Sequence, residues 1–341
     1  MLDRLRAAID PYIMLMLATV GLAALAPAYG RGAQIAGEIA NAGIVFLFFL
    51  YGARLSPRAA WDGLRQWRLQ LAVLLSTFAL FPILGLGFRI VASTVLPLAL
   101  CNGLLFLCLL PSTVQSSIAF TSIARGNVPA ALCAASASNI LGILLTPLLV
   151  GWLMHTQGAP LSFDVFRDIL LQLLAPFLAG QLLRHWIGAW IQRHRKVLGF
   201  ADRGSILAII YVAFSKGMAD HIWRQIQLLN LAILMVFLAA LLAAALLLTA
   251  LIARRLLRLS VDDEIVLQFC GSKKSLASGL PIASVLFAGP QLGLIVLPLM
   301  LFHQLQLIVC AVLARRYAAR LQPAVDLAGP LATPASVLLE S

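Results

Sequence analysis

The sequence is dominated by long apolar runs that are separated by short segments rich in arginine, proline or glycine. Hydrophobic residues make up 62% of the 341 residues and charged residues only 11%, whereas an average soluble domain is about 25% charged. A water-soluble fold cannot bury so much apolar side chain, and disorder requires low hydrophobicity. We therefore expect the chain to fold in a lipid bilayer, where a spanning helix needs roughly 20 apolar residues.

The apolar runs predict an all-α polytopic membrane protein with ten transmembrane helices. A signal peptide is a poor interpretation of the first run, because Asp3 and Asp10 offset Arg4 and Arg6 before it. All five cysteines fall inside apolar runs without metal-site spacing, so we expect buried free thiols. The approximate limits of the spans are 11–29, 32–53, 69–88, 95–124, 127–154, 165–190, 200–219, 227–253, 263–288 and 290–314.

The net charge of +12 is explained by membrane topology rather than by nucleic-acid binding. Ten spans place most of the Lys and Arg residues on one side, and no basic stretch is long enough to form a nucleic-acid arm. Lys and Arg accumulate in cytoplasmic loops. Both termini are therefore expected in the cytoplasm, in a multi-pass protein of a bacterial inner (plasma) membrane.

The most charged loop, near residues 184–203, divides the chain into two halves of five spans. We expect a first repeat over residues 1–160, a second over residues 161–320 and a cytoplasmic tail over residues 321–341. Because five is odd, the second half enters the membrane from the opposite face. This arrangement of two inverted repeats is typical of secondary transporters.

Each half has an interruption in its fourth span. The first is Pro111–Ser117 in span four, and the second is Cys270–Ser275 in span nine, with Pro281 shortly after it. Proline removes a backbone donor, and irregular backbone at membrane depth is tolerated only inside protein or beside a wet cavity. Matched interruptions predict broken helices that cross at a transport site; the alternative is a pair of proline kinks in ordinary helices.

Several segments along essentially the whole chain together resemble the bile acid:sodium symporter family. The stretch Phe269–Gly279 is similar to the sodium/bile acid cotransporter 7-like branch. The resemblance implies a panel domain and a core domain, with broken helices crossing in the core and sodium-driven uptake of organic anions bound between the domains. The segments that carry it are Gly52–Pro57, Pro111–Ser117, Ala124–Val128, Thr146-Pro147 and Phe269–Gly279.

The sodium-binding positions that the resemblance implies are only partly kept. Ser116 and Ser117 match a serine–asparagine pair at the first crossing. Other expected hydroxyl, carboxylate and amide ligands fall on Ala131, Ala135, Phe269, Lys273 and Thr77. Sodium is therefore expected as a ligand only through the resemblance, and no other metal or cofactor is expected.

Two adjacent lysines, Lys273 and Lys274, fall near the middle of span nine, where a charge costs about 2.5–3.5 kcal/mol on insertion scales. In one interpretation the Lys273 ammonium replaces sodium, which makes transport sodium-independent, or proton-coupled if the lysine titrates. In a second, either lysine binds an anionic substrate. In a third, both side chains snorkel to the surface. We favour Lys273 as the structural or coupling cation and Lys274 as the lysine closer to substrate.

The candidate solute- and ion-binding residues come from both interruptions and from spans five and ten. They are Thr113, Ser116, Ser117, Asn139, Ser272, Lys273, Lys274, Ser275 and Gln304, with Thr77, Glu38 and His303 as secondary candidates.

These residues predict a secondary transporter of a small anionic organic solute that works by alternating access. One alternative, a cation/proton antiporter, would need an acidic residue at the crossing, and neither break contains one. The second alternative is a membrane regulator of ion (calcium) homeostasis that carries no solute. No enzyme is expected, because His303 is the one clearly embedded histidine and no nucleophile or metal-ligand cluster accompanies it. The expected partners are the solute and the lipid bilayer; the sequence does not distinguish a monomer from a homodimer.

Overall fold

The computed structural model describes residues 11–54, 66–154, 163–221, 227–287 and 289–320, and none of these residues forms a β-strand. The all-α prediction is confirmed. The elements in chain order, with η marking π-helix, are α2 (Pro11–Leu25), α3 (Gly30–Arg54), α5 (Trp67–Leu75), η2 (Ser76–Leu80), α6 (Phe81–Ala92), α7 (Leu98–Cys108), α8 (Gln115–Ile123), α9 (Val128–Leu153), α10 (Phe163–Arg193), α11 (Arg195–Ala219), α12 (Leu228–Leu251), η4 (Ile252–Leu256), α13 (Val261–Gly271), α14 (Leu276–Leu286) and α15 (Leu292–Arg320). The predicted tail over residues 321–341 lies outside the described residues.

Six helical stretches among the described residues are long and apolar enough to cross a membrane. They are Gly30–Arg54, Trp67–Ala92, Val128–Leu153, Arg195–Ala219, Leu228–Leu256 and Leu292–Arg320, and shorter apolar helices cover Met14–Leu25 and Leu98–Cys108. Length and composition thus identify a polytopic membrane protein. The count of ten spans and the inverted repeat stay predictions.

Both predicted interruptions are confirmed. Helix α7 ends at Cys108 and α8 begins at Gln115, while α13 ends at Gly271 and α14 begins at Leu276. The alternative of two continuous, kinked helices is therefore wrong. Within α7, each residue from Leu104 onward is fully buried, as is the non-helical Leu110 that follows. Polar backbone groups freed at this break have no access to solvent and need partners inside the protein.

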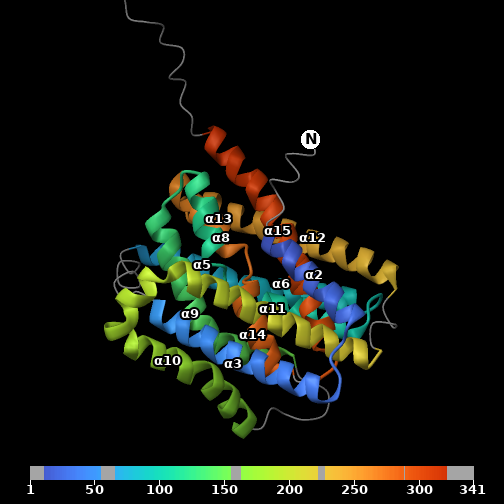
Figure 1. Cartoon of the computed structure of the whole chain (residues 1–341). Coiled ribbons are helices and arrows are strands. Elements are labelled where there is room, and N and C mark those ends of the chain that lie inside the picture. The colour runs from blue at the N-terminus through green and yellow to red at the C-terminus, as the bar shows by residue number, and fades with distance from the viewer. Residues whose placement is uncertain (1–10, 55–65, 155–162, 222–226, 288, 321–341) are drawn as a thin grey trace, which may run out of the picture.

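Helices α2, α3, α10 and α11 pack together on one side of the molecule (Figure 1). The closest approach is between α3 and α10, where a Cβ on Gly52 would lie 1.9 Å from the Phe177 carbonyl oxygen and a Cβ on Gly180 would lie 2.0 Å from that of Phe49. Only glycine permits this reciprocal backbone contact. The Tyr51 hydroxyl then links α3 to α14 by donating to the Ala277 carbonyl at 3.2 Å.

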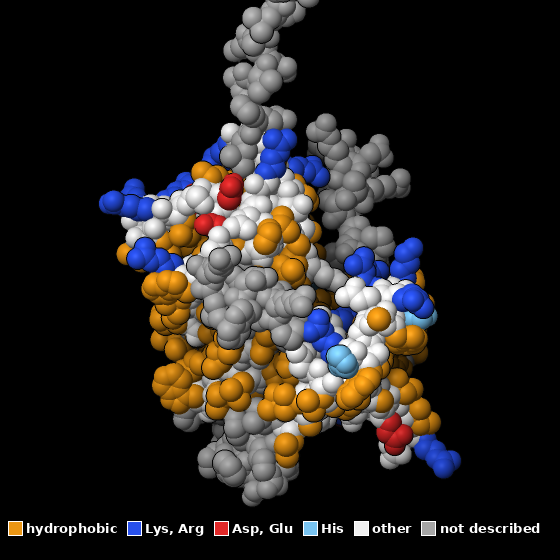
Figure 2. Space-filling model, turned by 90° about the vertical axis from the view of Figure 1, so that its left-hand side faces the viewer, with side chains coloured by type: hydrophobic (Ala, Val, Ile, Leu, Met, Phe, Trp, Pro, Cys, Tyr) orange, Lys and Arg blue, Asp and Glu red, His pale blue; other side chains and the backbone are white. Residues whose placement is uncertain are grey.

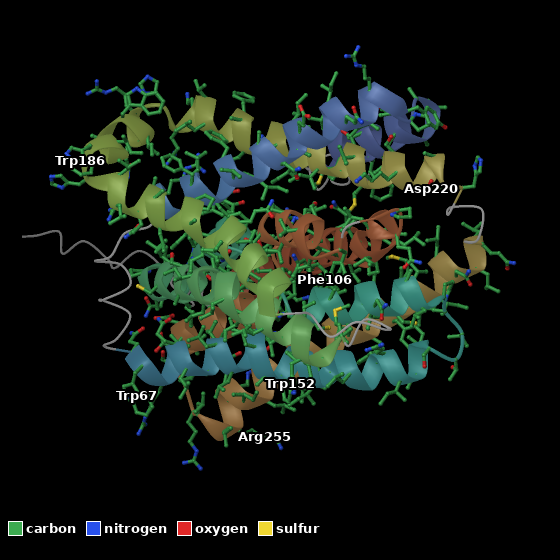
Figure 3. All side chains as sticks on the ribbon, turned by 90° about the horizontal axis from the view of Figure 1, so that it is seen from below. Trp67, Phe106, Trp152, Trp186, Asp220 and Arg255 are labelled. Carbon is green, nitrogen blue, oxygen red and sulfur yellow. The ribbon has the colours of Figure 1, made fainter. Side chains whose placement is uncertain are left out.

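The surface is largely apolar, as expected for a protein surrounded by lipid. In Figure 2, hydrophobic side chains cover most of the described part of the visible face, and Lys and Arg gather toward its upper end and right side. Trp67 and Trp186 lie on one side of the molecule in Figure 3, and Asp220 lies at the opposite end. All five cysteines are buried and free, which confirms that prediction.

Candidate functional site

The two helix breaks lie against each other and are joined by hydrogen bonds. The Ser275 backbone N–H donates to the Pro111 carbonyl at 2.9 Å. The Ser112 hydroxyl donates to the Cys270 carbonyl at 2.5 Å. A third bond of 2.9 Å runs from the Ser117 hydroxyl to the backbone of the α13 end. Segments about 160 residues apart in sequence therefore form one polar centre inside an apolar protein.

Four consecutive carbonyls at the first break, Leu109 to Ser112, each accept a hydrogen bond from a residue of another element. Helix ends leave such groups unpaired, and no bulk water reaches this depth to satisfy them. The donors in order are Thr146 Oγ1 at 2.9 Å, Lys274 Nζ at 2.7 Å, the Ser275 N–H at 2.9 Å and Asn139 Nδ2 at 2.8 Å.

Lys274 is fully buried and donates to three backbone carbonyls at once. Its ammonium lies 2.8 Å from the oxygen of Thr77, 2.9 Å from that of Cys108 and 2.7 Å from that of Leu110. An ammonium has three donors, so all are used. The ring centroid of Phe81 lies 4.2 Å from the same nitrogen. The carboxyl end of α7 carries the negative end of a helix dipole, which favours a cation there.

The Thr77 carbonyl is available because of the π-helix η2. In an α-helix the Phe81 N–H would bond to it, but here that N–H bonds to the Ser76 carbonyl. Pro82, the next residue in line, has no N–H to offer. The Cys108 carbonyl is freed in a similar way, since the Ser112 N–H donates to the Ser138 hydroxyl at 3.0 Å. Thr77 thus contributes its carbonyl, while its hydroxyl donates within its own helix.

Gln306 on α15 fixes the backbone of Lys274. Its side-chain amide accepts from the Lys274 N–H and donates to the Lys274 carbonyl, both at 2.9 Å, and it contacts His303 Nδ1 at 2.9 Å. The predicted Gln304 is only half-buried and makes no hydrogen bond to a described residue. Residues three apart share a helix face, so His303 indicates Gln306 and not Gln304 as its polar neighbour.

Lys273 is equally buried but has far fewer partners. Its ammonium donates to the Ser116 hydroxyl at 3.3 Å and lies 4.5 Å and 5.6 Å from the ring centroids of Phe120 and Phe269. Its other two N–H groups have no acceptor among the described residues. Since neither lysine reaches the surface, the prediction that they snorkel is wrong.

The hydroxyls of Thr113, Ser116 and Ser117 form a chain beside Lys273. Ser116 donates to Thr113 at 2.8 Å, and Thr113 and Ser117 share a hydrogen bond of 2.8 Å. All three belong to the start of α8 or to the segment just before it. The structure therefore links these three predicted hydroxyls to Lys273 through Ser116.

Asn139 bridges the two breaks from α9. Its amide donates to the Ser112 carbonyl at 2.8 Å, and its oxygen accepts from the Ser278 hydroxyl at 2.7 Å. Ser275 caps α14 by accepting from the Ser278 N–H at 3.1 Å. Ser272 donates back into α13, to the Gln268 carbonyl. The predicted Glu38, in contrast, is exposed on α3 and makes no hydrogen bond or ion pair with a described residue.

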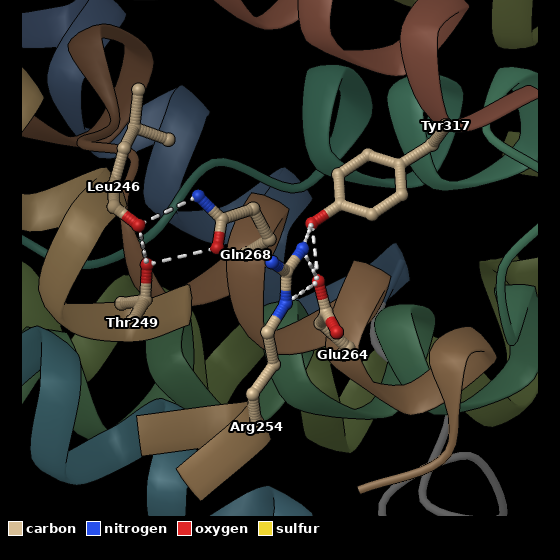
Figure 4. Close-up of polar contacts among 6 residues, drawn as sticks. All are labelled: Leu246, Thr249, Arg254, Glu264, Gln268 and Tyr317. Carbon is tan, nitrogen blue, oxygen red and sulfur yellow. Dashed lines mark hydrogen bonds and ion pairs between the residues drawn. The ribbon is translucent and has the colours of Figure 1, made fainter. Parts of the chain in front are cut away.

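Sequence reasoning missed an ionic cluster at the start of α13 (Figure 4). Arg254 donates to Glu264 Oε1 from Nε at 2.9 Å and from Nη2 at 2.6 Å, and the Tyr317 hydroxyl donates to the same oxygen at 2.6 Å. Ser260 before three acidic residues of the first turn is a pattern typical of a helix start, but it does not identify the partners of Glu264. No group of His, Cys, Asp or Glu among the described residues is arranged to hold a metal ion.

Known proteins match along almost the whole chain. The model of the SBF-like CPA transporter family matches residues 10–319. An uncharacterized protein of Pseudomonas aeruginosa is 52% identical over 91% of this chain and 93% of its own length. The candidate symporter YfeH of Escherichia coli is 47% identical over 91% of this chain and 93% of its own length. Mouse sodium/bile acid cotransporter 7 is 26% identical over 90% of this chain and 92% of its own length. The chain therefore belongs to the SBF-like CPA transporter family, which confirms the resemblance to bile acid:sodium symporters and makes it a membrane transporter and not an enzyme.

Proposed function

We propose that this chain is a secondary transporter that carries a small anionic organic solute by alternating access, and that the solute binds beside Lys273 where the two breaks cross. One observation supports the proposal above the others. Lys273 holds a fully buried ammonium with one hydrogen bond of 3.3 Å and no acidic partner among the described residues. A buried charge without a partner is costly, so a site of this kind favours an anionic ligand.

The surroundings of Lys273 strengthen the preference for an anion. Its hydrogen-bond partner Ser116 belongs to the first turn of α8, where a helix has the positive end of its dipole. Two positive features therefore meet at one point inside the protein. Half-helix amino ends that point at anionic substrate groups are a known device of secondary transporters. The hydroxyls of Thr113 and Ser117 supply further hydrogen-bonding groups beside it.

The proposal about ion coupling rests on the other lysine, Lys274. Three carbonyl oxygens within 3 Å of one point are an arrangement that suits a monovalent cation, and the Lys274 ammonium occupies that point. We therefore assign Lys274 as the built-in cation and Lys273 as the solute contact, the reverse of the roles favoured from the sequence. In this assignment transport does not require sodium.

The topology completes the proposal. Six long helices, together with α2, α10 and the two broken pairs α7–α8 and α13–α14, make ten crossings. The matched breaks support two inverted repeats, and the excess of Lys and Arg on one side supports cytoplasmic termini. The bacterial relatives support placement in a bacterial inner membrane.

The test begins with thermal stability in detergent, measured against monovalent organic anions such as acetate, pyruvate, benzoate and cholate. Anions that stabilise the wild type but not Lys273→Gln are then tested for uptake into proteoliposomes, in sodium chloride and in choline chloride. We expect uptake by the wild type in both salts and loss of uptake in Lys273→Gln. Ser136→Ala is the control, because the Ser136 hydroxyl makes no hydrogen bond to a described residue.

Two results would overturn parts of the proposal separately. A strict, saturable requirement for sodium contradicts the role of Lys274 and leaves the solute site standing. Absence of uptake for every anion that stabilises the protein contradicts solute carriage and favours the regulatory alternative.

A further inference from the structure

A second polar site lies in the group of helices α2, α3, α10 and α11. It is a cavity of about 710 Å³ where α3 ends and where α10 turns into α11. Its polar lining is strongly basic and consists of Arg54, Gln181, Arg184, His185, Gln192 and Arg195. None of these residues contributes to the site at the breaks.

Arg54 is held ready for a ligand by an ion pair. Its Nη1 donates to Asp202 Oδ2 on α11, which fixes the guanidinium. Its Nε and Nη2 atoms are buried and have no hydrogen-bond partner among the described residues. These two atoms form one edge of the guanidinium, the edge that binds two oxygens of a phosphate or carboxylate in parallel. Buried donors without acceptors are rare in proteins and call for an explanation.

Among the described residues, the charge of the other arginines of the cavity is not compensated. Arg184 and Arg195 form no ion pair with a described residue. Of the acidic residues that the structure describes, Asp202 balances one of the three guanidinium groups. The site is therefore built for an anion, and the fork of Arg54 matches a phosphate ester.

The surroundings of the cavity are those of a membrane interface. Trp186 and Trp190 on α10 and Phe200 on α11 expose 72%, 55% and 74% of their surface, and Figure 3 shows Trp186 at the edge of the molecule. Tryptophan gathers where the lipid headgroups begin. These aromatic residues do not line the cavity, but their exposure on the same two helices indicates that the basic cavity lies at the depth of the lipid headgroups.

We propose that this cavity binds the phosphate headgroup of an anionic glycerophospholipid, with Arg54, Arg184 and Arg195 around the phosphate. Basic pockets between transmembrane helices bind such headgroups in other membrane proteins. The site is independent of the solute site and does not rest on the proposed transport activity.

The experiment compares lipid binding to the purified full-length protein by native mass spectrometry. Phosphatidylglycerol and phosphatidylcholine with identical acyl chains are the probes, and glycerol 3-phosphate is the soluble one. We expect the wild type to prefer phosphatidylglycerol over phosphatidylcholine by about tenfold. The double variant Arg184→Gln, Arg195→Gln should lose this preference. If it does not fold, each single variant should show about a threefold loss.

The matched control removes the same charge from the same helical hairpin. Arg193 and Lys196 flank the turn between α10 and α11 and do not line the cavity. The double variant Arg193→Gln, Lys196→Gln should keep most of the preference. An equal loss of the lipid preference in both double variants would show that the preference arises from diffuse surface charge, and it would overturn the site. Binding of glycerol 3-phosphate as tight as that of phosphatidylglycerol identifies a soluble phosphate as the ligand and overturns the lipid assignment.

Discussion

The ammonium of Lys274 lies 2.8 Å from the carbonyl oxygen of Thr77, a residue 197 positions earlier in the chain. That oxygen is available because the Phe81 N–H is shifted onto Ser76 by a short π-helix and because Pro82 has no N–H. A local irregularity in one helix therefore prepares the acceptor for a lysine in another. The relation makes the helix breaks a structural centre as well as a candidate binding site.

Lys274→Met should destabilise the protein much more than Lys273→Met. The first substitution leaves three buried carbonyls without their donor, at about 1–3 kcal/mol each, so we expect a loss of about 3 kcal/mol or more in the free energy of unfolding. The second removes a buried charge with a single long hydrogen bond, which is often neutral or stabilising. Thermal unfolding in detergent measures both. Equal melting temperatures for the two variants would contradict the assigned roles.

Asn139→Leu should uncouple the two breaks. The variant removes the donor to Ser112 and the acceptor for Ser278, and we expect a loss of about 2 kcal/mol in the free energy of unfolding together with reduced uptake. Ser136→Ala, three residues away on α9, is the matched control and should change neither quantity. If Asn139→Leu keeps wild-type stability, the bridge does not hold the breaks together.

Gly52→Ala and Gly180→Ala should each abolish the close packing of α3 against α10. A new Cβ would lie 1.9 Å or 2.0 Å from a backbone oxygen, so the helices must separate. We expect a loss of at least about 3 kcal/mol, at the high end for overpacking. Gly37→Ala is the control, because its added Cβ would have no atom of another helix within 4 Å. It should stabilise α3 by about 0.5–1 kcal/mol through helix propensity alone.

Arg254→Gln should weaken the attachment of α13 to η4 and α15, whereas Arg255→Gln should have no effect. Arg254 binds the buried carboxylate of Glu264, while the exposed Arg255 side chain forms no ion pair or hydrogen bond with a described residue. Because half of the Arg254 side chain is exposed, we expect only about 1 kcal/mol. Chemical denaturation of the two variants side by side measures the difference. An equal effect of both substitutions would indicate that the lost net charge, and not the ion pair, changes the stability.

The sequence predicts the helical architecture well because the bilayer restricts it. Long apolar runs admit one regular structure, and Pro111 and the Cys270–Ser275 segment mark the two breaks where the structure has them. Burial of both lysines is likewise predicted by their distance from either end of the run. These features depend on local composition, which a sequence displays directly.

The partners of each lysine could not be predicted, because they depend on which carbonyls stay free. The side chains of adjacent residues in a helix point about 100° apart. No local sequence feature indicates whether Lys273 or Lys274 contacts the end of α7. The sequence does not distinguish Gln304 from Gln306 for a similar reason. Both are polar and mid-helix, and only the position of the Lys274 backbone distinguishes them.

A cation that is covalently attached to the chain cannot be released on one side of a membrane and taken up on the other. While Lys274 occupies its three carbonyls, that position carries no ion across and draws no work from an ion gradient. The energy for any accumulation of solute has to enter elsewhere, through the concentration difference of the solute itself, through its charge in the membrane potential, or through an ion that travels with it.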